Sequence, residues 1–203
     1  CRWIEGTPAV QASEILRLLK SAQDTRESND QRSQLMRLTY GGALIAEFSE
    51  PQTEPPQMSA PNDAWVQDYS EQADDSITGL SDADLVYLAG RGIGGAEERG
   101  ALQEAAKHTG AQIGATRAAV LAGWYPIGLQ VGISGLQLNS RAALVLGASG
   151  AAAFTAGLER CGMLIAVNND AEVPIFRRAD YGVLASCSDI LQALNAAAQS
   201  PNE

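Results

Sequence analysis

The sequence predicts an α/β domain in which helices cover both faces of a parallel sheet. From residue 85 onward, short apolar runs alternate with helical patterns at close intervals. These runs are continuously apolar, which is typical of parallel strands buried on both faces. Three of the runs lead into glycine-rich turns. The chain has 203 residues, which is enough to bury a sizeable core.

We expect three parts along the chain. Residues 1–36 are predicted to form an N-terminal helix and linker, residues 37–84 a strand followed by a proline-rich, acidic arm, and residues 85–203 the α/β domain. Within the first part, residues 12–20 have the apolar spacing of a helix. Residues 21–34 are polar and predict a loop or linker.

The second part is expected to be extended. Residues 44–48 predict a short strand, and the four prolines of residues 49–63 exclude regular structure there. Residues 1–86 hold 15 acids and 6 bases, so the N-terminal region is acidic. We expect the stretch 63–84 to be a solvated loop, with a docking face as the alternative.

The elements of the α/β domain follow in order. Strands are expected over residues 85–89, 111–115, 129–133, 142–148, 164–167 and 182–185. Helices are expected over residues 96–108, 117–121, 149–157 and 188–199. Gly110 follows the first of these helices, where a glycine commonly ends a helix.

Three glycine-rich turns follow strand ends, at residues 90–95, 132–135 and 147–150. In a parallel sheet they share the carboxyl edge, where ligands bind. Glycine permits close approach of the backbone, and a following helix offers free N–H groups that suit a phosphate. The alternative is that these are tight turns with no ligand. GRGIGG (90–95) matches neither a full dinucleotide fingerprint nor a P-loop, which disfavours a plain NAD dehydrogenase.

Two arginines, Arg91 and Arg117, stand at strand ends. A guanidinium can pair with a phosphate or stack on an aromatic ring system, although each could also be a plain surface charge. His108 is the one histidine of the sequence and is expected on a helix surface. A metal centre with several imidazole ligands is therefore excluded, and no nucleophile–base pair supports a hydrolase or transferase.

The composition excludes other classes of function. A net charge of −10 argues against nucleic-acid binding, which requires a basic surface. No apolar run is long enough to predict a membrane span. The three cysteines lack the spacing of a disulfide framework or a zinc site, so we expect a reducing compartment.

From about residue 37 to residue 188, the chain resembles the C-terminal, FAD-binding part of the α subunit of electron-transfer flavoproteins. The blocks that support this resemblance begin with YGG (40–42) and PQM (56–58) and continue through the following motifs: GRGIGG (90–95), GATRAAVLAG (114–123), LQVGISG (129–135), LGASGA (146–151), VNNDAEVPIFRRADYG (167–182) and LAS (184–186). The fold implied is an FAD/NAD-binding-like α/β domain, and the cofactor implied is FAD.

The resemblance also implies which residues bind the cofactor. Arg91, with the adjacent Gly92, and Thr116 would contact FAD, and Arg117 would lie over the isoalloxazine ring. The residues that would follow the flavin are Val131, Gly132, Ile133 and Ser134. Those that would wrap the pyrophosphate and the ring are Ser149, Gly150, Ala151, Ala152, Ala153 and Phe154. Asn168 would hold the adenosine side, and Ser186 and Cys187 stand where the family also touches the cofactor.

Several positions depart from the family pattern. Ala153 and Phe154 stand where the family has Gln-His, and phenylalanine cannot donate a hydrogen bond to the flavin. The remaining departures replace polar, charged or rigid family residues: Leu136 for a lysine, Ser140 for a proline, Asn169 for a lysine, Ser186 for an acid and Ser134 for a threonine.

The resemblance implies an electron carrier that takes electrons from dehydrogenases, pairs with an electron-transfer flavoprotein β subunit and needs no acid or base catalyst. The alternative is a divergent module that binds FAD or AMP for assembly without flavin redox cycling. The expected location is the cytoplasm of a bacterium, or the mitochondrial matrix in a eukaryote.

Overall fold

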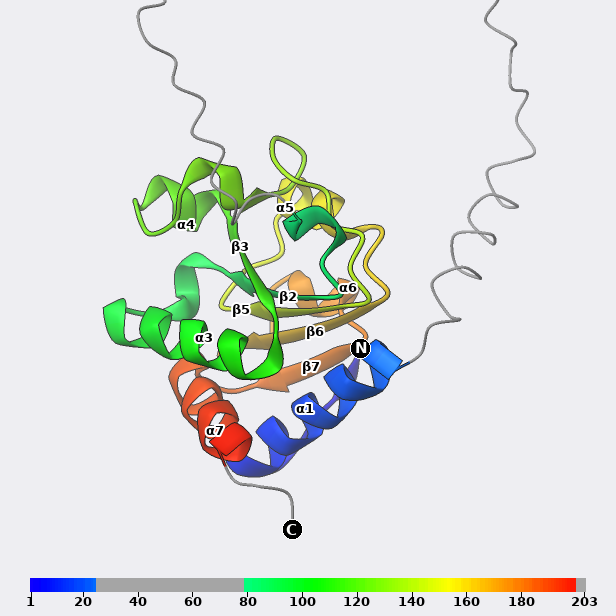
Figure 1. Cartoon of the computed structure of the whole chain (residues 1–203), viewed down its shortest axis with the longest axis vertical. Helices are drawn as coiled ribbons and strands as arrows, with labels where there is room; N and C mark the ends of the chain where they lie inside the picture. The colour runs from blue at the N-terminus through cyan, green and yellow to red at the C-terminus, as the bar shows by residue number, and fades with distance from the viewer. Residues whose placement is uncertain (25–78, 200–203) are drawn as a thin grey trace, which may run out of the picture.

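A computed structural model describes residues 1–24 and 79–199, which form one parallel sheet with helices on both faces (Figure 1). The predicted fold class is confirmed. The expected strand at 44–48, the proline-rich stretch 49–63 and most of the acidic stretch 63–84 lie outside the described residues.

In the described part of the chain, seven strands form the sheet: β1 (Arg2–Trp3), β2 (Leu85–Ala89), β3 (Gln112–Thr116), β4 (Gln130–Val131), β5 (Ala142–Leu146), β6 (Met163–Asn168) and β7 (Tyr181–Leu184). Neighbouring strands pair in parallel in the order β1-β7-β6-β5-β2-β3-β4. The chain runs from β2 outward to β4, returns to β5 beside β2, and then runs outward to β7. The β2–β5 pair is therefore the topological switch point, where open parallel sheets bind ligands.

The helices cover the two faces unequally. The longer helices, α1 (Pro8–Asp24), α3 (Ala96–Thr109) and α7 (Cys187–Gln199), pack side by side on one face (Figure 1). The opposite face is covered by α5 (Ala152–Thr155), α6 (Ile175–Arg178) and the 3-10 turn η4 (Ala156–Leu158). The remaining short elements are η1 (Leu80–Asp82), η2 (Arg91–Ile93), α4 (Arg117–Leu121) and η3 (Ile127–Leu129).

Burial on both faces explains why the central strands are continuously apolar. Along β2, the side chains of Leu85 and Tyr87 enter the core under the long helices, whereas Val86 and Leu88 enter the core on the opposite face. Strand β5 divides its side chains in the same way. The two faces of the sheet therefore each have their own hydrophobic core.

Helix α3 begins and ends as its sequence predicts. The Glu98 carboxylate accepts the N–H of Gly95 at 2.6 Å, which satisfies one free donor at the start of the helix. Gly110 ends the helix in the left-handed conformation, with φ of 70°.

Three predicted elements are shorter than expected. The strand expected over 142–148 ends at Leu146 as β5, before Gly147, which adopts φ of 64°. The strand expected over 129–133 is reduced to β4, because Gly132 adopts φ of 139° and its N–H bonds to the Leu136 carbonyl at 3.0 Å. The helix expected over 149–157 is reduced to α5 and η4, because Gly150 adopts φ of 83° ahead of it. In all three places a glycine with positive φ stands where a regular element was expected.

The pairing of β1 with β7 was not predicted from the sequence. Arg2 is paired with Tyr181 and Trp3 with Gly182, so residues 1–24 belong to the same sheet as residues 85–199. Helix α1 then packs against α7 on the long-helix face. No helix within the described residues is both long enough and apolar enough to cross a bilayer.

The turns after β2 and β5 contact each other backbone to backbone. The N–H of Gly90 donates to the Leu146 carbonyl at 2.8 Å, and the N–H of Gly92 donates to the Gly147 carbonyl at 2.8 Å. A Cβ atom added to Gly90 would lie 2.3 Å from the Gly147 oxygen. This contact requires glycine because no side-chain atom fits between the two backbones.

Substituting Gly90→Ala is therefore expected to lower the free energy of unfolding by about 3 kcal/mol or more, because the methyl group meets backbone that cannot move aside. Urea unfolding followed by circular dichroism measures the change. Gly100→Ala is the matched control: its Cβ meets nothing within 4 Å, and it lies inside α3. The control is expected to stabilise the chain by about 0.5 to 1 kcal/mol. Equal stability of the two variants would contradict the packing described.

Candidate functional site

The predicted site residues gather at the carboxyl edge of the sheet. Arg91 follows β2, Thr116 ends β3, Ser134 follows β4, Ser149 follows β5 and Asn168 ends β6. All these strands are parallel, so their ends meet at one edge. Ser186 and Cys187 follow β7 at the far end of this edge.

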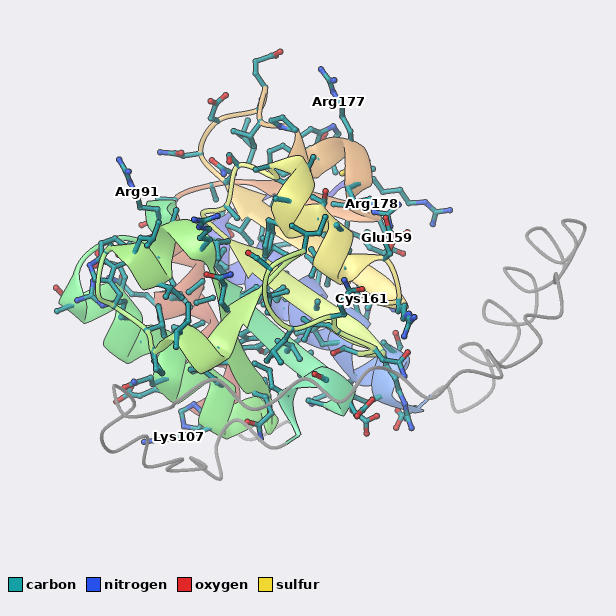
Figure 2. All side chains as sticks on the ribbon, turned by 90° about the horizontal axis from the view of Figure 1, so that it is seen from above. Arg91, Lys107, Glu159, Cys161, Arg177 and Arg178 are labelled. Atoms are coloured by element: carbon teal, nitrogen blue, oxygen red, sulfur yellow. The ribbon has the colours of Figure 1, made fainter. Side chains whose placement is uncertain are left out.

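Two cationic side chains are exposed at this edge. Arg91 lies in η2 and Arg117 is the first residue of α4, on the neighbouring strand connection. Within the described ranges, neither arginine has an ion-pair partner. Figure 2 shows Arg91 pointing away from the fold and well separated from Lys107 of α3. Both guanidinium groups can therefore meet an anionic ligand without breaking an existing ion pair.

Thr116 has a structural role in placing Arg117. Its side chain is buried, and its hydroxyl accepts the N–H of Ala119 at 3.4 Å. This is the N-cap arrangement that starts a helix, so α4 begins directly after β3. The hydroxyl is thus engaged by the backbone, and Arg117 is held at the edge of the sheet.

The turn after β4 is fixed by its neighbours. Gln130 donates its side-chain N–H to the Ser134 hydroxyl at 3.0 Å, and the Ile133 N–H donates to the Ala153 carbonyl at 2.7 Å. Gly132 lies so close to Ala153 that an added Cβ would be 2.6 Å from its carbonyl oxygen. The turns after β4 and β5 therefore form one unit, with the Ile133 side chain 69% exposed at its surface.

The turn after β5 offers free backbone donors. Among the residues that the structure describes, Gly150 and Ala151 donate no backbone hydrogen bond. Gly150 packs against α6, where an added Cβ would lie 2.3 Å from the Ile175 nitrogen. Gly150 itself is buried, whereas Ala151, Ala152 and Ala153 are exposed and small, so the exposed part of this turn is residues 151–153.

Phe154 is turned inward. It is 6% exposed and belongs to the core under α5 and α6, together with Val131 and Leu158. Its ring therefore fills the core, and only its backbone lies near the turn after β4. Val131, another expected contact, is buried in the same core.

Three further expected contacts have structural partners in the protein. Asn168 donates to the Ala148 carbonyl at 3.1 Å and accepts the Asp170 N–H at 3.1 Å, which ties the ends of β5 and β6 together. The Ser186 hydroxyl accepts the Asp189 N–H at 3.1 Å at the start of α7. Cys187 is buried in the core beneath the long helices.

Two positioning residues were not predicted from the sequence. Arg99 of α3 donates to the Gly94 carbonyl at 3.4 Å, and its guanidinium lies 4.7 Å from the centre of the Trp124 ring. It therefore links the first glycine turn to the segment after α4. Gln130, which donates to Ser134, is 5% exposed at the end of the sheet. A polar residue within an apolar strand pattern usually has a hydrogen-bonding partner, and this feature of the sequence could have indicated the role of Gln130.

The residues at the central part of the edge fit the diphosphate and ring of a dinucleotide. Arg91 and Arg117 supply positive charge, Gly150 and Ala151 supply backbone donors, and Ile133 supplies exposed apolar surface. Because the chain has a net charge of −10, an anion at this edge would have to be held by these local donors rather than by the overall field.

Comparison with known proteins supports the family resemblance found in the sequence. Residues 79–159 match the model of the electron transfer flavoprotein FAD-binding domain. The chain contains a C-terminal domain of the electron-transfer flavoprotein α type. The family recognised in the sequence is thereby confirmed.

Three curated proteins show the sequence similarity of this chain to known proteins. The chain is 40% identical over 136 residues to the mitochondrial electron transfer flavoprotein subunit alpha of Oryza sativa subsp. indica, which covers 67% of this chain and 37% of that protein. It is 36% identical over 131 residues to the electron transfer flavoprotein subunit alpha of Paracoccus denitrificans, and this match covers 64% of this chain and 42% of that protein. It is 34% identical over 122 residues to the LctC subunit of an Acetobacterium woodii lactate dehydrogenase (NAD(+),ferredoxin), and this match covers 60% of this chain and 29% of that protein.

The chain thus spans about two fifths or less of the length of these relatives. Two of the three relatives are named for electron transfer.

Burial of Cys187 has a consequence at alkaline pH. Desolvation raises the pKa of this thiol to about 12, with the Glu98 carboxylate contributing in the same direction. Above about pH 8.5, the ordinary pKa of a thiol, the unfolded chain loses this proton and the folded chain keeps it. The free energy of unfolding should therefore fall as the pH rises.

We expect Cys187→Ala to reduce this alkaline loss by up to about 1.4 kcal/mol for each pH unit. Urea unfolding at about pH 8 and about pH 10 measures the difference, since the two values bracket the ordinary thiol pKa. Cys1 is exposed, so Cys1→Ala is expected to behave as the wild type. The same alkaline loss in Cys187→Ala and the wild type would show that the buried thiol is not responsible.

Proposed function

We propose that this chain supplies the FAD-binding domain of an electron-transfer flavoprotein α subunit and carries electrons from dehydrogenases to an acceptor. The observation that supports this most directly is the pair of exposed arginines without ion-pair partners in the described ranges, Arg91 and Arg117, at the same edge of the sheet as the free N–H groups of Gly150 and Ala151. These are positions that the family resemblance assigns to FAD.

Each residue would have a defined part in holding the cofactor. Arg91 would pair with the diphosphate together with the N–H groups of Gly150 and Ala151. Arg117 would stack over the isoalloxazine, where its charge favours electron uptake. Bound FAD would supply the redox chemistry, so the chain itself needs no catalytic acid or base.

The flavin environment would be less polar than the family pattern implies. Phe154 lies in the core and has no donor, and Ala153 is equally without one. The Ser134 hydroxyl is already bonded to Gln130. Arg117 would therefore supply most of the side-chain electrostatic influence on the ring.

The apolar surface beside this edge is suited to a protein partner. Leu121, Ile127 and Ile133 are 74%, 72% and 69% exposed, on α4, on η3 and after β4 respectively. We propose an electron-transfer flavoprotein β subunit as the partner on this surface, in a heterodimer that receives electrons from dehydrogenases. The relatives include mitochondrial and bacterial proteins, so the proposed location is the mitochondrial matrix or the bacterial cytoplasm.

The proposal predicts that the full chain retains FAD after desalting, and that Arg91→Ala and Arg117→Ala each weaken binding about tenfold, since a charged hydrogen bond contributes about 1.5 to 3 kcal/mol. Quenching of flavin fluorescence on titration gives the Kd, and visible absorbance before and after dithionite reports reduction of the bound flavin.

Lys107→Ala is the matched control, because Lys107 is exposed on α3 and lies well apart from Arg91 (Figure 2). It should leave the Kd unchanged. A wild-type chain that retains no flavin, or arginine variants that bind as well as the control, would contradict the proposal.

A further inference from the structure

The first 24 residues complete the sheet from a distant place in the sequence. Residues 25–78 separate this segment from the rest of the described chain. The N–H of Arg2 donates to the Asp180 carbonyl at 2.7 Å, and the N–H of Ile4 donates to the Gly182 carbonyl at 2.8 Å. The Trp3 ring also lies 4.8 Å from the Phe176 ring, centre to centre.

Helix α1 contributes an amphipathic face to the same contact. Ala12, Ile15, Leu18 and Leu19 are between 0% and 5% exposed and belong to the core shared with α7 and the sheet. The outer face of α1 is solvated, with an Arg17–Glu14 ion pair. This pattern is that of a helix laid onto an apolar surface.

The strand and helix of this segment are also joined to each other. The Gln11 side chain is 6% exposed and donates to the Ile4 carbonyl at 3.0 Å. This bond links β1 to α1 within residues 1–24. Residues 1–24 therefore have an internal geometry that suits docking as one unit.

Arg141 holds the other end of the helix. Its guanidinium donates to the Gln23 carbonyl in the last turn of α1 and pairs with the Asp84 carboxylate at 3.0 Å. A cation is favourable at the carboxyl end of a helix, where backbone carbonyls lack partners. Arg141 thus links α1 to the start of β5 and to the residue before β2.

These contacts are the kinds that form between separate molecules: strand addition at a sheet edge, an apolar helix face and a charged cap. We propose that residues 1–24 are a docking module, bound to the surface formed by β7, α7 and Arg141, and that the contacts described above are sufficient to hold it there. Because the module is covalently joined to the chain that carries this surface, its effective concentration is high and it occupies the site of its own chain. The inference does not depend on FAD binding.

The test cuts this covalent connection in the full chain. A specific protease site is introduced within residues 25–78, the purified chain is cleaved, and the product is examined by gel filtration with light scattering. The two pieces are expected to elute together at the mass of the uncut chain and to separate in urea. Separation of the two pieces without denaturant would overturn the proposal. An uncut chain that elutes at twice its own mass would contradict the claim that residues 1–24 bind to their own chain.

Two pairs of variants identify the contacts that matter. Ile15→Asp places a charge on the buried face of α1, whereas Val10→Asp changes an apolar residue of the same helix that is 56% exposed. Only Ile15→Asp should release the cleaved segment. Arg141→Ala should weaken retention about tenfold, whereas Arg160→Ala, at an exposed arginine, should not.

Adding a peptide tests whether the larger piece of the Ile15→Asp variant is still folded. A labelled synthetic peptide of residues 1–24 is added to the cleaved Ile15→Asp chain, and its binding is followed by fluorescence anisotropy. The peptide should bind and elute with the larger piece. Failure of the wild-type peptide to bind would show that the segment is an ordinary part of one folding unit, which contradicts the proposal even if FAD binding is normal.

Discussion

The contact between the turns after β2 and β5 determines where everything else at the carboxyl edge can lie. Gly90 and Gly92 hydrogen-bond to backbone carbonyls of Leu146 and Gly147, and no Cβ fits between them. The ends of β2 and β5, which are distant in sequence, are thereby held in contact at the topological switch point. Small residues here bring backbone against backbone, and further along the same turn the N–H groups of Gly150 and Ala151 donate no backbone hydrogen bond.

From this contact, the exposed charges of the site follow in order. The first turn places Arg91 on η2, and the N-cap of Thr116 places Arg117 at the start of α4. Arg99 ties the first turn to the Trp124 region, so the two arginine-bearing connections are held relative to each other. The positions of the two charged side chains at this edge are thus set by uncharged backbone contacts and by helix capping, together with the Arg99–Trp124 contact.

The sequence predicted the order of strands and helices well because both faces of the sheet are buried, and continuous apolar runs such as Leu85–Ala89 record that burial directly. It did not predict the inward side chain of Phe154, because a family position indicates where the backbone runs and not which way a substituted side chain turns. It also did not predict β1, because two residues at a sheet edge give no periodic signal.

Hydrogen–deuterium exchange measured along the whole chain, with and without added FAD, tests the central claim most directly. The account predicts slower exchange at the amides of Gly150 and Ala151 when FAD is added, with little change in α1. Protection confined to other parts of the chain, or none at these two amides, would contradict the assignment of the dinucleotide to this edge of the sheet.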